Sequence, residues 1–217
     1  MIATRHGNFA VKKGDKLAGT RIIPLVIEEE KMKKVKAQTM ELTGGKPILE
    51  LKPFQHKQVG IITTGNEVFH GRIQDTFTPV IVDKLAEFNA EVTDHVTWDD
   101  DDKKVTASIL DMIEKGADIV ICTGGMSVDP DDKTPLARIV SYGAPVLPGA
   151  MFLLAYYDRV EQGKNRRTVI MGLPGCVMYA KRTIFDLVLP RVMADDEVTA
   201  DELAALGMGG LCLNCPV

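Results

Sequence analysis

Apolar residues along the chain gather into short runs that are separated by glycines and by charged segments. The clearest run is Ala117–Cys122, which is rich in β-branched residues and fits a strand buried on both faces of a parallel sheet. Similar runs predict further strands at Val59–Thr63, Phe152–Tyr157 and Thr168–Met171, and Glu91–Trp98 is predicted as a strand with a less clean alternation of apolar and polar residues. The pattern therefore predicts a sheet with a deeply buried centre.

Between these runs the apolar residues recur at helical spacing. Ile81, Leu85 and Phe88 fall at i, i+4 and i+7, which places them on one face of a helix. Val105, Ile109, Met112 and Ile113 repeat this pattern, and Gly116 marks the end of their helix. Two further helices are predicted, one over Thr134–Tyr142 and a long one from Gly175 toward Val192.

Polar residues mark where two of these helices begin. The four aspartates from Asp99 to Asp102 stand before the helix that carries Val105, where acidic side chains favour the positive end of the helix dipole. Thr76 is a suitable cap for the helix that carries Ile81. The acidic run is therefore interpreted mainly as a helix start, with catalysis as the minor alternative.

Strands and helices that alternate in this way predict an α/β fold, a three-layer and mostly parallel sheet with helices on both faces. Residues 58–195 carry the pattern. Residues 1–57 differ, and we expect a small strand-rich unit there, with strands at Arg21–Ile27 and Pro47–Leu51 and a short helix over Glu28–Val35. Residues 196–217 form a tail that ends in a Cys-x-x-Cys pair.

Composition narrows the class of protein and of partner. The 217 residues are 45% hydrophobic and 26% charged, which is ordinary for a globular protein. A net charge of −4 without a basic stripe argues against a nucleic-acid partner. No apolar run is long enough for a membrane span and no signal-peptide core follows Met1, so we expect a cytoplasmic protein with reduced cysteines.

Three glycine-bearing loops follow predicted strands, at residues 64–67, 123–127 and 172–175. Loops at the carboxyl ends of parallel strands meet at one edge of the sheet, which is where ligands bind in open α/β folds. The free N–H groups of the helix expected after Gly175 would suit a phosphate. Neither a Walker sequence nor a GxGxxG fingerprint is present, so the loops would hold a phosphate-bearing ligand in another way.

The ordered motifs TTGNE, GRIQD, TGGMSVDPDDKTP, LPG and GLPG resemble those of the molybdopterin-binding domain family. The resemblance covers residues 58 to 192. That family includes molybdotransferases, which insert molybdate, and adenylyltransferases, which activate the pterin with ATP. The resemblance implies binding of molybdopterin, or of its adenylylated or metal-loaded form, with Mg²⁺, and with ATP or molybdate as further substrates. It also implies a transferase and self-association into a homo-oligomer.

The resemblance implies roles for individual residues. The ligand-binding set is Thr64, Gly65, Gly124, Gly125, Ser127, Thr134, Pro174 and Gly175. Glu67 and Asp132 are the implied Mg²⁺ ligands, because oxygen donors suit this hard ion. Asp132 and Asp75 are the implied catalytic residues. For each glycine, turn geometry alone is an alternative, and each acid alone is more often a solvated surface group.

Two departures from the molybdotransferase pattern bear on function. Leu147–Met151 stands where that family carries KPGKP, so both lysines are missing, and Cys176-Val177 replaces Asn-Pro after GLPG. A thiol at a helix start has a lowered pKa, although a small buried filler is the favoured interpretation of Cys176. Molybdate insertion is thereby disfavoured. The alternatives are a nucleotide pyrophosphatase of the CinA-like family and a non-catalytic carrier or sensor of molybdenum cofactor.

The last residues contain Cys212 and Cys215, which supply half of a four-cysteine metal site. We expect no stable metal on this pair alone. The abrupt start and end of the sequence suggest a piece of a longer native chain.

Overall fold

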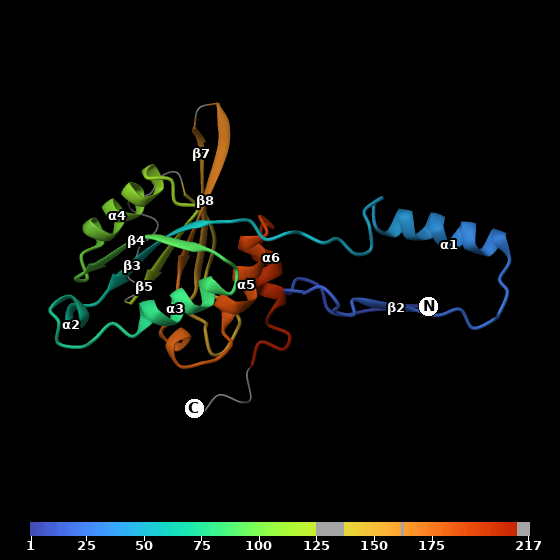
Figure 1. Cartoon of the computed structure of the whole chain (residues 1–217), viewed down its shortest axis with the longest axis horizontal. Helices are drawn as coiled ribbons and strands as arrows, with labels where there is room; N and C mark the ends of the chain where they lie inside the picture. The colour runs from blue at the N-terminus through green and yellow to red at the C-terminus, as the bar shows by residue number, and fades with distance from the viewer. Residues whose placement is uncertain (125–136, 162, 212–217) are drawn as a thin grey trace. The chain divides into compact units, whose positions relative to one another are not determined.

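The computed structural model of the chain describes residues 1–124, 137–161 and 163–211 (Figure 1). Contacts divide the chain into two compact units, Met1–Pro53 and Phe54–Val217. The boundaries expected after residues 57 and 195 stay predictions. Cys212 and Cys215 lie outside the described residues.

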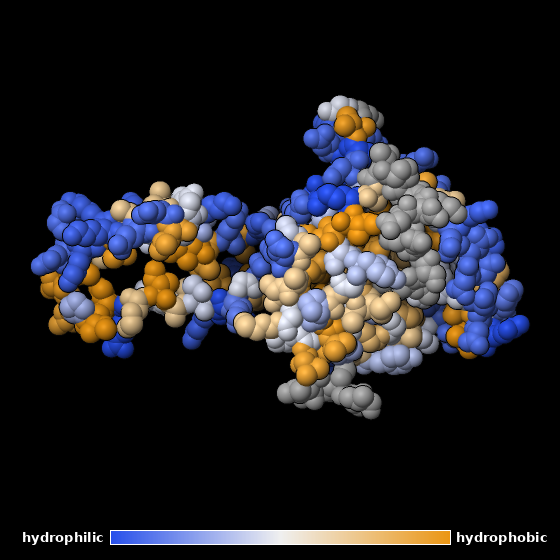
Figure 2. Space-filling view, turned by 180° about the vertical axis from the view of Figure 1, so that it is seen from behind, coloured by the Kyte–Doolittle hydropathy of each residue, from blue (hydrophilic) through white to orange (hydrophobic). Residues whose placement is uncertain are grey.

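The first unit is small and has little regular structure. Strands β1 (Ile2–Thr4) and β2 (Ala18–Thr20) pair antiparallel, and the helix α1 spans Glu29–Leu42. The predicted helix is confirmed and runs further than expected, but the strands predicted at Arg21–Ile27 and Pro47–Leu51 are wrong. None of the residues of this unit is buried. Its apolar segments therefore pack against no core, and such packing is what stabilises a strand. Figure 2 shows the resulting patches of apolar surface.

The second unit is built on a six-stranded sheet with the order β4-β3-β5-β8-β7-β6. Its strands are β3 (Gln58–Thr64), β4 (Glu91–Trp98), β5 (Ile119–Thr123), β6 (Ala137–Tyr142), β7 (Leu153–Glu161) and β8 (Lys164–Gly172). The first four strands in this order run parallel, whereas β7 and β6 are antiparallel to their neighbours. The predicted α/β fold with a mostly parallel sheet is therefore confirmed.

Helices cover both faces of this sheet (Figure 1). On one face, α3 (Phe77–Ala86), α5 (Ile184–Met193) and α6 (Ala200–Ala205) share a core with alternate residues of the strands. On the other face, α4 (Asp102–Glu114) packs with the intervening residues. In β5 the alternation is clear, because Ile119 and Ile121 face the first core while Val120 and Cys122 face the second. A strand buried on both faces is the structure that its uninterrupted apolar run predicts.

Two predicted helices are wrong. The segment Ala137–Tyr142 of the helix expected over Thr134–Tyr142 forms β6, because it pairs with β7; residues 134–136 lie outside the described part. The helix expected from Gly175 is broken into a four-residue 3-10 turn, η1 (Gly175–Met178), and α5. Helix α5 starts only at Ile184 because Thr183 and Asp186 form a capping box there.

The start of α4 is confirmed and that of α3 is corrected. The side chain of Asp101 accepts from the backbone N–H of Lys103 at 2.9 Å and of Lys104 at 3.3 Å, so the acidic run does begin α4. Thr76 precedes α3 but makes no capping hydrogen bond with its side chain. Asp75 takes that role, because its carboxylate reaches the first N–H groups of the helix.

Candidate functional site

The carboxyl ends of the four parallel strands lie in a row at one edge of the sheet. Register pairs Thr64 with Trp98 and Thr63 with Thr123, and it pairs Cys122 with Gly172. The loops that leave β3, β5 and β8 therefore begin side by side. This is the edge at which open α/β sheets bind ligands.

Thr64 and Gly124 bring two of these loops into direct contact. Gly124 has φ of 98°, and a Cβ atom on it would lie 2.0 Å from the carbonyl oxygen of Thr64. The hydroxyl of Thr64 donates to the carbonyl oxygen of Thr123 at 3.0 Å. Only glycine fits at position 124, because the backbones approach too closely for any side chain. The structure thus places two residues of the predicted ligand-binding set next to each other.

Thr123 lies at this contact and was missed by the sequence analysis. It is 1% exposed, and its hydroxyl has no hydrogen-bond partner among the described residues. Its side chain points to the same face as Ile119 and Ile121, because side chains alternate along a strand. A buried hydroxyl without a partner costs about 1–3 kcal/mol, so a ligand atom that bonds to it would recover that cost. The sequence signal was a polar residue at the end of an apolar run.

Asp75 is the centre of a polar cluster beside the same edge. Its Oδ1 accepts from the N–H groups of Phe77 at 2.8 Å and Thr78 at 3.1 Å. Its Oδ2 accepts from the hydroxyls of Thr78 at 2.5 Å and Thr63 at 3.4 Å, and the Nε2 atom of His95 lies 3.8 Å away. These bonds fill both oxygens and fasten α3 to the end of β3. Whether Asp75 is also catalytic stays a prediction.

The same contacts set the charge of Asp75. Partial burial alone would raise its pKa, but the hydrogen bonds from Thr78 and Phe77 and the attraction of His95 together hold the pKa of Asp75 below its ordinary 3.8. A carboxyl whose pKa is lowered on folding stabilises the fold above its unfolded pKa. That contribution is lost as the pH falls through the folded value.

We expect Asp75→Asn to lower the free energy of unfolding by about 1 kcal/mol at pH 7, because the amide keeps the cap of α3 but accepts fewer bonds. The difference from the wild type should shrink as the pH falls from the unfolded pKa of about 4 through the lower folded pKa, where the wild-type carboxyl becomes neutral like the amide. Urea unfolding at a series of pH values measures both quantities. A difference that stays constant down to pH 2 would contradict the lowered pKa.

Gly65 and Gly175 are accessible positions of the loops, whereas Pro174 is buried. Gly65 has φ of 147° and donates its N–H to the carbonyl oxygen of Trp98 at 3.1 Å. A Cβ atom on Gly65 or on Gly175 would meet no heavy atom of the described residues within 4 Å, so these residues leave the backbone open to a ligand at both positions. Pro174 precedes η1, which is too short to act as the phosphate-binding helix expected after Gly175.

The loop after β3 and the loop after β8 also touch. The hydroxyl of Thr76 lies 3.2 Å from the sulfur of Met178 in η1, and α3 packs on η1. The structure therefore brings Thr64 and Gly124 together at the end of β5, with Asp75 and η1 beside the neighbouring loop.

The metal-ligating residues are only partly described. Glu67 lies exposed on the short helix α2 (Asn66–Phe69). Asp132 and the ligand-binding residues Gly125, Ser127 and Thr134 lie outside the described residues. Within the described ranges, no group of three or more His, Cys, Asp or Glu side chains is placed to hold a metal ion.

An aromatic and cationic cluster at the rim of this edge was also missed. Trp98 ends β4, and the ring of Phe69 in α2 lies 6.3 Å from it between centroids. The ammonium group of Lys104 lies 5.5 Å from the Trp98 ring and 5.7 Å from the Phe69 ring, and it bonds to Asp99 at 2.8 Å. The cluster thus offers ring faces and one cation beside the loops after β3 and β4.

Neither described cysteine is exposed. Cys122 is buried in β5, and burial raises the pKa of its thiol to about 12, which keeps it protonated and unreactive. Cys176 is half-buried in η1 rather than at the start of a long helix. The burial and position of Cys176 favour the interpretation as a small filler over that as an activated thiol.

Comparison with known proteins identifies the family. A family model described as "Probable molybdopterin binding domain" matches residues 60–194, which contain the sheet and the site edge. The chain belongs to this molybdopterin-binding domain family. No helix among the described residues is long and apolar enough to cross a membrane.

Individual relatives match less of the chain. CinA-like proteins of Mycobacterium tuberculosis and Mycobacterium avium are 35% and 32% identical to it over 77 residues. These matches cover 36% of this chain and only 18% of each relative.

Solved structures with a similar fold include the molybdopterin biosynthesis enzyme MoaB of Thermus thermophilus, at 25% identity and a TM-score of 0.48 over 62% of this chain and 91% of that one. Another is a molybdopterin biosynthesis protein of Pyrococcus horikoshii, at 22% identity and a TM-score of 0.48 over 69% of this chain and 37% of that one.

Proposed function

We propose that the carboxyl edge of the sheet binds molybdopterin, or its adenylylated or metal-loaded form, in the biosynthesis or handling of molybdenum cofactor. The observation that carries this proposal is the buried hydroxyl of Thr123, which has no partner in the described part of the chain and lies where the strand-end loops meet. Membership of the molybdopterin-binding domain family supports the choice of ligand. The oxygen and nitrogen atoms of a pterin phosphate can form hydrogen bonds with such a hydroxyl.

The proposed contacts to the ligand combine residues of the described loops with residues that the family motifs suggest. Backbone N–H groups near Gly124 and Gly175 bind phosphate and pterin edges, and Thr64 and Pro174 shape the loops around them. Ser127, Thr134 and Gly125 complete the set. Glu67 and Asp132 hold Mg²⁺ at the phosphate, while Asp75 positions the loop after β3. Any transfer at a phosphate then rests on positioning and charge neutralisation.

We expect Thr123→Val to weaken binding of the pterin about fivefold without lowering the melting temperature. Valine has the shape of threonine but lacks the hydroxyl, so the ligand loses one hydrogen bond while the empty fold loses a buried unsatisfied group. The test purifies the wild type and the variant from a molybdenum-replete host. Mass spectrometry of the released small molecules then gives the fraction of protein that carries a pterin, beside a thermal melt.

A matched control is Thr106→Val, which makes the same change on α4, outside the loops that follow β3, β5 and β8. It should leave the pterin content unchanged. A wild type that carries no pterin, or a Thr123→Val variant that carries as much as the wild type, would contradict the proposal.

The role of Mg²⁺ is tested on the same samples by measuring pterin affinity with and without the ion. Asp132→Asn and Glu67→Gln remove charge but keep size, and each should abolish the gain that Mg²⁺ gives. Equal affinities in the wild type and both variants would leave these acids as surface groups.

A second candidate function is a CinA-like nucleotide pyrophosphatase. The sequence identity to CinA-like proteins over 77 residues favours it. Mg²⁺-dependent hydrolysis of ADP-ribose by the purified chain distinguishes it. A third outcome, pterin release without turnover of ATP, molybdate or ADP-ribose, would identify a carrier or sensor. The proposal includes a cytoplasmic location for each of these functions. It also includes self-association into a homo-oligomer.

A further inference from the structure

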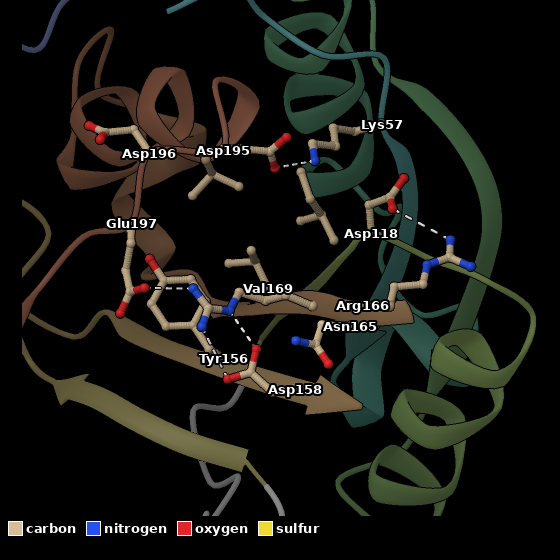
Figure 3. A pocket seen from close by; sticks show the side chains of 13 residues that line it. Lys57, Asp118, Tyr156, Asp158, Asn165, Arg166, Val169, Asp195, Asp196 and Glu197 are labelled. Carbon is tan, nitrogen blue, oxygen red and sulfur yellow. Dashed lines mark hydrogen bonds and ion pairs between the residues drawn. The ribbon is translucent and has the colours of Figure 1, made fainter. Parts of the chain in front are cut away.

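A pocket of about 290 Å³ lies at the opposite edge of the sheet from the candidate site, where β5 and β8 begin (Figure 3). Asp118 directly precedes β5, and Arg166 and Arg167 come from the first half of β8. The carboxyl end of α5 and the residues after it complete the wall. This pocket is separate from the edge to which the ligand loops belong.

The floor of the pocket is apolar. Ile119, Val169 and Val192 contribute aliphatic side chains that are all buried in the core shared with α5. An occupant therefore gains from a hydrocarbon part of matching size, since apolar area removed from water stabilises the bound state. Charged side chains surround this floor, so the occupant must also carry a polar end.

Each cationic side chain of the lining already holds a carboxylate. Lys57 bonds to Asp195 at 2.5 Å, and Arg167 bonds to Asp158 at 2.5 Å and to Glu197 at 2.6 Å. Arg166 lies 3.5 Å from Asp118 and also donates to the carbonyl oxygen of Gly116. Figure 3 shows these pairs arranged around the pocket. An anionic occupant would have to displace them, which disfavours an anion.

Acceptor atoms, by contrast, are left over. Lys57 bonds to Oδ1 of Asp195, whose Oδ2 has no partner in the described part of the chain, and this side chain is 64% exposed. In Asp118, Oδ2 accepts from the backbone N–H of Gln58 at 2.9 Å, whereas the contact of Oδ1 to Arg166 is at the long limit of a hydrogen bond, so Oδ1 is the weakly held acceptor. Helix α5 ends at Met193, just before Asp195, so the negative end of its dipole also lies at the pocket.

We propose that this pocket binds an organic cation, an ammonium or guanidinium group on a short aliphatic chain. The chain lies on Ile119, Val169 and Val192, and the cation donates to Asp195 and Asp118. The same chemistry is offered by a free amine and by a lysine or arginine side chain of a polypeptide. The proposal does not depend on the pterin site, because the two sites lie at opposite edges of the sheet.

The experiment measures binding of agmatine to the full chain by titration calorimetry at low salt, with 1-pentanol and pentanoate as uncharged and anionic comparisons. Agmatine should bind saturably and the other two should not. Asp195→Asn should weaken agmatine binding about tenfold, because it removes one charge-assisted acceptor and frees Lys57. Asparagine tolerates the left-handed backbone of position 195, where φ is 52°, so the fold is kept.

The matched control is Asp111→Asn, which also removes the carboxylate of a lysine pair but lies on α4, at the other face of the sheet. It should leave agmatine binding unchanged, as should Thr123→Val.

A capped Gly-Arg-Gly peptide distinguishes the two sources of the cation. Tighter binding of the peptide identifies a polypeptide side chain, and tighter binding of agmatine identifies a free amine. Equal binding of 1-pentanol, no effect of Asp195→Asn, or no binding of either cation would overturn the proposal.

Discussion

Replacing Asp186 by alanine should lower the free energy of unfolding by about 4 kcal/mol. The Asp186 carboxylate bonds to the ammonium group of Lys84, and only 8% and 14% of these two side chains are exposed. Breaking a buried pair costs about 3–5 kcal/mol, because the remaining charge stays buried without its partner. Asp186 also accepts from the N–H of Thr183 at 2.8 Å, so the same change removes the cap of α5. Urea unfolding at pH 7 measures the loss.

Two further variants separate the causes. Asp111→Ala breaks the exposed pair with Lys115, and we expect it to cost less than about 1 kcal/mol. The double variant Lys84→Met with Asp186→Leu removes both charges, so it should recover most of the loss. A cost for Asp186→Ala as small as that for Asp111→Ala would contradict a buried pair between α3 and α5.

Gly124→Ala should destabilise the fold by about 3 kcal/mol and abolish pterin binding. The added methyl group would overlap the backbone of Thr64, so one of the two loops has to move. Alanine is also strained at a φ of 98°. The displaced loops are those that we propose to bind the ligand, hence both properties should change together. Thermal unfolding and the pterin content of the purified protein provide the two measurements.

Gly163→Ala is the control for backbone strain alone. Gly163 has φ of 76° between β7 and β8, and a Cβ atom there meets no atom of the described residues within 4 Å. We expect it to cost about 1 kcal/mol and to leave the pterin content unchanged. If the two alanine variants lose the same stability, the close approach of Gly124 to Thr64 is not what requires glycine.

The central strands could be predicted because their sequences leave one reasonable structure. Ile119–Thr123 and Val59–Thr63 are short, apolar and bounded by glycine or polar residues, so burial on both faces follows from composition alone. The face of α4 was equally clear, since Val105, Ile109 and Met112 recur at helical spacing and are all buried. Local pattern and tertiary structure agree in these elements.

The errors lie where distant partners decide the structure. Residues 137–142 form a strand because β7 lies beside them, and this pairing is not visible in a segment that also suits a helix. The break between η1 and α5 depends on Asp186 and Thr183, whose capping box was hidden inside an expected helix. In residues 1–53 no residue is buried, so apolar pattern carried no information about strands.

The candidate site shows the same division. The glycines and Thr64 could be proposed from the sequence, because loops at strand ends are recognisable there, and they lie within the range that the family model matches. Thr123 and His95 were missed, because their significance comes from burial and from neighbours that are distant in the chain. Asp75 was found from its motif, but its four hydrogen bonds could be seen only in the fold.

The absence of any buried residue in α1 has a consequence for how the chain melts. A helix of 14 residues without a packed face depends on its own nucleation and propagation, which leaves it marginal in water. Its amide protons should exchange with solvent through local fraying, whereas those of β5 exchange only when the whole sheet opens. Ellipticity should therefore decline gradually with temperature before the cooperative transition of the sheet, and heat absorption should report the second unit alone.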